Sequence, residues 1–126
     1  VASEIIKLMI KKEIKIKNAK VLMLGITFKE NCPDIRNTKV IDVYTELQSY
    51  GVDLMLHDPW ASPEEVRHEY GIPVVNELPN EKYDAVVLTV AHNEYKNLKM
   101  DALKNDNAVV YDVKAFFNKA DIDGRL

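Results

Sequence analysis

The sequence has little cysteine and no long hydrophobic run. Cys32 is the single cysteine among 126 residues, which excludes a disulfide within the chain and is typical of a reducing compartment. The longest apolar run, from Ala85 to Ala91 with Thr89 inside it, is too short to cross a bilayer, and no signal peptide opens the chain. We therefore expect a cytoplasmic protein with no membrane partner.

Positive charge is not in excess either. Seventeen Lys and Arg stand against 20 Asp and Glu, so the net charge is −3. Such a chain has no general attraction for the phosphates of DNA or RNA, and nucleic acid is not an expected partner. Residues 1–20 do carry a local excess of lysine, and Lys7 and Lys11 are spaced like one face of a helix. We interpret this as a solvated helix face, with contact to an acidic neighbour as the alternative.

The composition is that of one folded domain. Apolar residues make up 47% of the chain and charged residues 29%, which is an ordinary globular balance and argues against disorder. The sequence begins Val-Ala-Ser-Glu, without methionine, inside an apparent helix. We predict that residues 1–14 are the end of a helix from a preceding domain and that residues 15–126 form the domain itself.

Apolar segments without alternation predict buried parallel strands, and they lie between segments of helical spacing. The predicted strands are Lys20–Gly25, Val52–His57, Ala85–Val90 and Ala108–Asp112, with a shorter one at Ile72–Val75. The predicted helices are residues 1–12, Lys39–Tyr50, a segment from Ser62 to about Tyr70, and most of residues 92–105. This alternation predicts an α/β fold with a doubly wound, Rossmann-like parallel sheet of about five strands and helices on both faces.

Ligands of such sheets bind beyond the carboxyl ends of the strands, where the strand order reverses. The residues that follow the strands are therefore the candidates. They are Thr27, Phe28, Lys29 and Arg36, then Asp58, then Thr89 and His92, and finally Asp112 and Lys114. The lysines would act as point charges and Arg36 as a bidentate fork, which suits a phosphate-bearing ligand.

Several familiar sites are absent. Gly25 is followed by Ile-Thr-Phe-Lys, so the Gly-x-Gly-x-x-Gly turn that lets backbone amides approach a pyrophosphate is missing, and we exclude NAD binding on that turn alone. A receiver domain would need acidic residues directly after the first strand, where this sequence has Gly25-Ile26-Thr27. The three histidines lack the spacing of metal ligands, so no metal is expected. Cys32 has no identifiable general base beside it, and we interpret it as a thiol that packs within its loop. Asp58 precedes Pro59, and we interpret it as a turn-forming residue, with a role in a ligand site as the alternative.

The loop after the first strand carries a specific motif. Residues 24–39 contain Gly-x-x-Phe-Lys followed by Asp-x-Arg-x-Thr, with Gly25, Phe28, Lys29, Asp34, Arg36 and Thr38 at the defining positions. This segment closely resembles the opening of the C-terminal, UDP-binding domain of the UDP-glucose/GDP-mannose dehydrogenase family. Asp58-Pro59, the Leu88–His92 segment with Tyr95, and Tyr111–Lys114 match later landmarks. The resemblance covers roughly residues 15–120. The residues of segment 24–39 are most similar to those of the UDP-N-acetylhexosamine dehydrogenase branch of polysaccharide biosynthesis.

The resemblance implies one part of an NAD-dependent enzyme that oxidises a sugar C6 alcohol to a carboxylate. Its NAD would be held mainly by an N-terminal domain, and its catalytic cysteine would lie in a central domain, so no catalytic residue is expected here and the fragment alone should be inactive. Phe28 and Lys29 correspond to substrate contacts, Lys114 lies at or next to a substrate-binding arginine position, and Arg36 corresponds to a contact to the NAD phosphates. A UDP-sugar and a second subunit, in a homodimer or larger assembly, are the implied partners. A free-standing Rossmann-like binding or regulatory module is the alternative.

Overall fold

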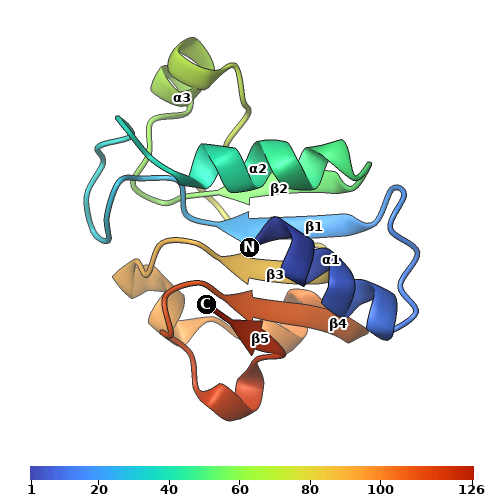
Figure 1. The fold of residues 1–126 in the computed structure, drawn as a ribbon. Helices are drawn as coiled ribbons and strands as arrows, with labels where there is room; N and C mark the ends of the chain where they lie inside the picture. Colours follow the sequence, from blue (N-terminus) through green and yellow to red (C-terminus); the bar gives the residue numbers. More distant parts are fainter.

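The computed structural model describes residues 1–126 and contains one parallel sheet of five strands in the order β2-β1-β3-β4-β5. The strands are β1 Lys20–Leu24, β2 Asp53–His57, β3 Tyr83–Leu88, β4 Lys104–Asp112 and β5 Gly124–Arg125. Their arrows point the same way in Figure 1, so their carboxyl ends share one edge. The strand order reverses between β1 and β3, which puts the expected ligand position at their ends. The predicted α/β parallel fold is confirmed.

The α-helices are α1 Ala2–Lys11, α2 Val40–Ser49 and α3 Pro63–Tyr70, and the 3-10 helices are η1 Asn93–Asn97, η2 Met100–Ala102 and η3 Lys119–Asp121. α3 begins where the sequence predicts, because the Ser62 hydroxyl accepts a hydrogen bond from the Glu65 N–H at 3.3 Å. It ends at Gly71, whose φ of +69° is the left-handed conformation that glycine adopts readily. None of the helices has both the length and the apolar character needed to span a bilayer.

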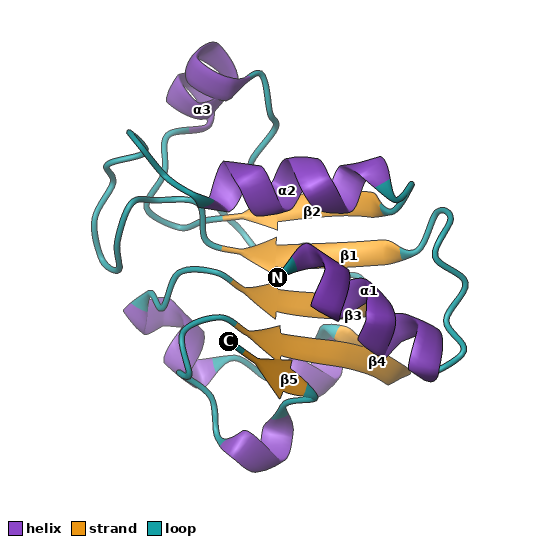
Figure 2. Cartoon of the chain, viewed as in Figure 1, coloured by secondary structure: helices purple, strands orange, loops and turns teal.

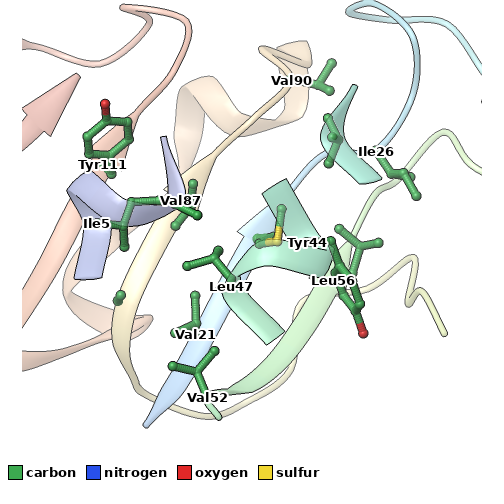
Figure 3. Close-up of a cluster of buried hydrophobic side chains, with 14 of the residues drawn as sticks. Ile5, Val21, Ile26, Tyr44, Leu47, Val52, Leu56, Val87, Val90 and Tyr111 are labelled. Atoms are coloured by element: carbon green, nitrogen blue, oxygen red, sulfur yellow. The ribbon is translucent and has the colours of Figure 1, made fainter. Parts of the chain in front are cut away.

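The main core lies between the sheet and the pair α1 and α2, which run across the same face in Figure 2. Alternation along β1 decides which side chains enter it: Val21 and Met23 face these helices, whereas Leu22 and Leu24 belong to a cluster on the opposite face. Figure 3 shows the main core, with Ile5 from α1 among the buried side chains. The opposite face is covered by η1, η2 and the loop after β4.

Two predicted elements are wrong in detail. Residues 92–105 form only two short helices, η1 and η2, before β4 begins at Lys104. Leu98 adopts an extended backbone between the two helices, with φ −63° and ψ 132°. Residues 72–75 do not form a strand: Val75 makes a single parallel bridge to His57. Pro73 has no N–H to donate to a ladder, which explains why the pairing stops there. The fifth strand is β5 instead.

Candidate functional site

The loop 26–38 leaves β1 at the point where the strand order reverses. It departs through Gly25, whose φ is +106° and where a Cβ atom would lie 2.5 Å from the Cβ of Val90. Only glycine fits this close approach. The hydroxyl of Thr89 lies 3.0 Å from the carbonyl oxygen of Leu24 and 2.5 Å from that of Gly25. The exits of β1 and β3 are therefore packed directly against each other.

Asp58, directly after β2, is fully buried and accepts hydrogen bonds from four backbone N–H groups. Its Oδ1 accepts from Trp60 at 2.7 Å and Ala61 at 3.1 Å, which confirms the predicted turn. Its Oδ2 accepts from Ile26 at 2.8 Å and Thr27 at 3.2 Å, at the start of loop 26–38. The carboxylate thus joins the β2 turn to the loop after β1.

His92, also fully buried, adds a third segment to this junction. Its Nδ1 accepts a hydrogen bond from the Asn31 N–H at 2.9 Å, so the ring proton lies on Nε2, which donates to Asp58 Oδ2 at 2.9 Å. Burial acts to raise the pKa of Asp58, but the hydrogen bonds from His92 and the Ile26 N–H outweigh it and hold that pKa below its ordinary value. Asp58 is therefore a carboxylate held in place by hydrogen bonds from three segments.

A second buried histidine lies beside this junction. His57 Nε2 is 3.0 Å from the carbonyl oxygen of Asn76, to which it donates, and Nδ1 is 2.9 Å from the hydroxyl of Tyr95. Burial lowers the pKa of His57 and raises that of Tyr95. Both side chains are neutral near pH 7, and together they anchor η1 to the end of β2.

Phe28 and Lys29 are exposed at the tip of this framework. The Phe28 N–H donates to the carbonyl oxygen of Asp34 at 2.7 Å, and the Thr27 hydroxyl donates to the carbonyl oxygen of Lys29 at 2.9 Å. The Phe28 side chain is 58% exposed, and Lys29 makes no ion pair. The loop backbone is thus fixed while these two side chains remain available to a ligand.

Arg36 is paired with Asp34 further along the loop. Its Nε and Nη2 donate to the two carboxylate oxygens, each at 3.0 Å, and hydrogen bonding to Arg36 lowers the pKa of Asp34 to about 2. The Arg36 side chain is 81% exposed. Because the pair uses one edge of the guanidinium, the Nη1 donors are still available for an anion.

Lys114 lies on a separate loop of the same sheet edge. The buried Asp112 at the end of β4 accepts the N–H groups of Lys114, Phe116 and Phe117 at 2.9, 2.6 and 2.7 Å, which shapes this loop. The Lys114 side chain is exposed and makes no ion pair. Phe28, Lys29 and Arg36 therefore lie on one loop, which follows β1, whereas Lys114 lies on the loop that follows β4. Strand β3 lies between β1 and β4 in the sheet.

Five of the candidate strand-end residues are buried, and their side chains make internal hydrogen bonds instead of facing a ligand. These are Thr27, Asp58, Thr89, His92 and Asp112. Sequence reasoning also missed Asn31, the partner of His92. Its left-handed φ of +54° is one that asparagine tolerates, but no local pattern indicated the contact.

The backbone after β1 is unsuited to a pyrophosphate, as the missing glycines predicted. The N–H groups of Ile26 and Thr27 already donate to Asp58, and α2 begins only at Val40. Cys32 is half-buried and hydrogen-bonded to no general base. No group of His, Cys, Asp or Glu side chains is arranged to hold a metal ion.

Comparison with known proteins gives consistent matches. Residues 22–119 match the model of the "UDP-glucose/GDP-mannose dehydrogenase family, UDP binding domain". The whole chain is 42% identical to a UDP-N-acetyl-D-glucosamine 6-dehydrogenase of Pseudomonas aeruginosa and 44% identical to one of Salmonella typhi, and it spans 31% and 30% of their lengths. An NDP-N-acetyl-D-galactosaminuronic acid dehydrogenase from Methanosarcina mazei has the same fold, with a TM-score of 0.76 and 24% identity over 93% of this chain and 26% of its own.

Proposed function

The chain belongs to the UDP-glucose/GDP-mannose dehydrogenase family, and from this premise we propose that it covers the UDP part of the substrate in an NAD-dependent UDP-sugar 6-dehydrogenase. Such an enzyme oxidises the C6 alcohol of the sugar to a carboxylate. The relatives named as UDP-N-acetyl-D-glucosamine 6-dehydrogenases support an N-acetylhexosamine as the sugar. We propose that the product is a precursor of polysaccharide biosynthesis. The observation that carries the proposal is loop 26–38, a fixed backbone that presents Phe28 and Lys29 where the strand order reverses.

Phe28 and Lys29 are the proposed substrate contacts on this loop. The ammonium group of Lys29 has no carboxylate partner, so a diphosphate would be its counter-charge. The exposed aromatic ring of Phe28 would supply apolar contact area to the ligand. Lys114 would reach the same ligand from the β4 loop as a second point charge.

Arg36 is the proposed contact to NAD, which this family's dehydrogenases use as hydride acceptor. The fit is chemical: one edge of the guanidinium is held by Asp34 at 3.0 Å, and its remaining donors suit a phosphate. The chain offers no dinucleotide turn of its own, so Arg36 would add one contact to a cofactor held mainly elsewhere. Changing Arg36 to Lys in the longer enzyme should raise KM for NAD by roughly tenfold or more and leave KM for the UDP-sugar nearly unchanged.

The rest of the enzyme would supply the chemistry. We place the catalytic thiol outside this chain, residues 1–14 at the end of a helix that leads from a central domain, and residues 15–126 in the substrate-covering domain. α1 already packs on the sheet through Ile5 and Met9, so that helix would join the two domains rigidly. The cytoplasm is the proposed compartment, and a homodimer or larger assembly the proposed state of the whole enzyme.

A titration of this chain with UDP tests the proposal. We expect millimolar or weaker binding, since this chain would form only one side of the enclosing cleft. Changing Lys29 to Ala should weaken binding several-fold. Changing Lys39 to Ala is the matched control, because Lys39 is also exposed and makes no ion pair but directly precedes α2, away from Phe28 and Lys29 in the sequence. Tight NAD binding, or no response to UDP, would contradict the proposal, and so would NAD reduction by the isolated chain that is lost on changing Cys32 to Ser.

A further inference from the structure

The backbone segment that carries Phe28 and Lys29 is held by hydrogen bonds at both ends. On one side, the Thr27 N–H donates to Asp58 Oδ2 at 3.2 Å. On the other side, Asn31 makes a reciprocal pair of bonds with the segment after β3. Its N–H donates to His92 Nδ1 at 2.9 Å, and its Oδ1 accepts from the Asn93 N–H at 2.8 Å.

The hydrogen bonds at both ends of this segment connect to the imidazole of His92. His92 uses Nε2–H to hold Asp58 and its Nδ1 lone pair to hold Asn31, so each ring nitrogen serves one end of the span. The Nε2 atom also lies 3.1 Å from the Thr27 hydroxyl oxygen. The ring of Trp60 stacks over the imidazole with centroids 6.3 Å apart, and the histidine is fully buried. A ligand at the exposed side chains would therefore never touch His92.

We infer that His92 is a positioning residue for nucleotide binding: it fixes the direction of Phe28 and Lys29 by holding the backbone on either side of them. The inference rests on the proposed function, because it takes these two side chains as substrate contacts. Its physical basis is preorganisation, since a loop ordered before binding loses less conformational freedom when the ligand arrives. Asn31 is the loop-side partner, held by these bonds at a φ of +54°.

Two substitutions separate positioning from general stability, because each keeps one half of the imidazole's hydrogen bonding. Asparagine has an oxygen at the position of Nδ1, and glutamine has an N–H donor at the position of Nε2. His92→Gln therefore keeps the bond to Asp58 and loses the one to Asn31, whereas His92→Asn does the reverse. Measured by amide hydrogen exchange, the Asn31 N–H should exchange roughly five- to tenfold faster in His92→Gln and within about twofold of the original rate in His92→Asn.

The global stability should change in the opposite order. His92→Asn leaves Asp58 without its side-chain donor and should lower the melting temperature more than His92→Gln. Equal loosening of the loop in both variants, in step with melting, would mean that His92 is only structural and would overturn the inference. Unchanged exchange in both, or loosening in His92→Asn alone, would overturn it as well.

A second pair of variants leaves the buried ring untouched. The hydrogen bonds that join Asn31 to His92 and Asn93 form a clamp on the loop. Asn31→Gly keeps the left-handed backbone but removes the side-chain bond to Asn93, so it weakens this clamp from the loop side. Asn37→Gly is the matched control: Asn37 is in the same loop with a φ of +56°, and its side chain makes no hydrogen bond. Amides of residues 28–30 should exchange several-fold faster in Asn31→Gly and not in Asn37→Gly. Equal effects in the two would refute the clamp.

UDP titration of the same variants connects the clamp to binding. His92→Gln and Asn31→Gly should weaken UDP binding several-fold with little change in melting, and Asn37→Gly should not weaken it. His92→Asn keeps the bond to Asn31 and should weaken UDP binding less than His92→Gln, although it lowers the melting temperature more. If the clamp variants loosen the loop as expected but bind UDP as well as the original chain, the positioning inference is wrong. If the original chain itself shows no UDP binding, the proposed function fails, and the positioning role in nucleotide binding fails with it.

Discussion

Two buried aspartates at the carboxyl edge of the sheet make the same kind of hydrogen bond but have different structural roles. Asp58 follows β2 and Asp112 ends β4, and both are fully buried acceptors of backbone N–H groups. The three N–H donors to Asp112 come from its own downstream loop, at most five residues away. Asp58 accepts from its own turn and also from Ile26, Thr27 and His92, which are 31 to 34 residues distant in sequence.

The difference concerns what each carboxylate holds. Asp112 shapes one loop, and no other segment depends on it. Asp58 joins the β2 turn, loop 26–38 and the segment after β3, so the loop that carries Phe28 and Lys29 is rigid only as long as this junction is intact. We therefore expect the two proposed sides of the nucleotide site to differ in rigidity, with Lys114 on the more independent loop.

The sharpest test of this comparison is the loss of Asp58. Changing Asp58 to Ala removes the acceptor for four backbone N–H groups, three of them buried, and for His92, and it should destabilise the chain by about 3–5 kcal/mol. Urea denaturation would measure this. Asp58→Asn, which keeps one carbonyl oxygen, should cost less, and equal losses in the two variants would mean that shape matters more than the hydrogen bonds.

The corresponding change at Asp112 should cost less. Asp112→Ala leaves three N–H groups of one loop, which can rearrange toward water, and we expect a loss of about 1–3 kcal/mol. Hydrogen exchange should quicken in residues 113–117 and not in loop 26–38. If both loops loosened, Asp112 would also be a long-range junction and the contrast with Asp58 would not hold.

We expect a falling pH to destabilise first the region at the end of β2, where His57 and Asp58 lie. Burial lowers the pKa of His57 below the ordinary value of 6.5, so the unfolded chain takes up this proton first. The stability that His57 contributes is thus present above pH 6.5 and lost as the pH falls below it. Asp58, whose pKa is lowered from 3.8, adds a further loss only below that value.

Unfolding free energies measured at several pH values would check this. His57→Gln should flatten the slope that begins near pH 6.5, because the titrating ring is gone. His68→Gln, at an exposed histidine of α3, is the matched control and should leave the slope as it is. A slope unaltered by His57→Gln would assign the acid sensitivity to another group.

The smallest effect is expected at the exposed pair of Asp34 and Arg36. Exposed ion pairs contribute little to stability, so Asp34→Asn should leave the melting temperature unchanged within error. What it removes is the carboxylate that orients the guanidinium. In the longer enzyme we expect a higher KM for NAD, and a lowered melting temperature with an unchanged KM would make the pair structural instead.

The sequence determined the sheet and the motif of the site. Short continuous apolar runs without alternation, such as Val21–Leu24, are typical of strands buried on both faces, and Ser62-Pro63 with Gly71 delimits a helix through local hydrogen bonds. These are short-range rules of backbone geometry. The motif around Phe28, Lys29 and Arg36 likewise depends on residues close together in the chain, so it could be found without coordinates.

Only the tertiary structure decided which strand-end residues face a ligand and which hold the framework. Asp58 and His92 carry side chains as suitable for a site as any on the surface, and their burial follows from how β1, β2 and β3 come together. The same holds for Asn31, whose partner is 61 residues away. Hydrogen bonds between distant segments leave no periodic trace in the sequence, because their geometry exists only after the sheet has formed.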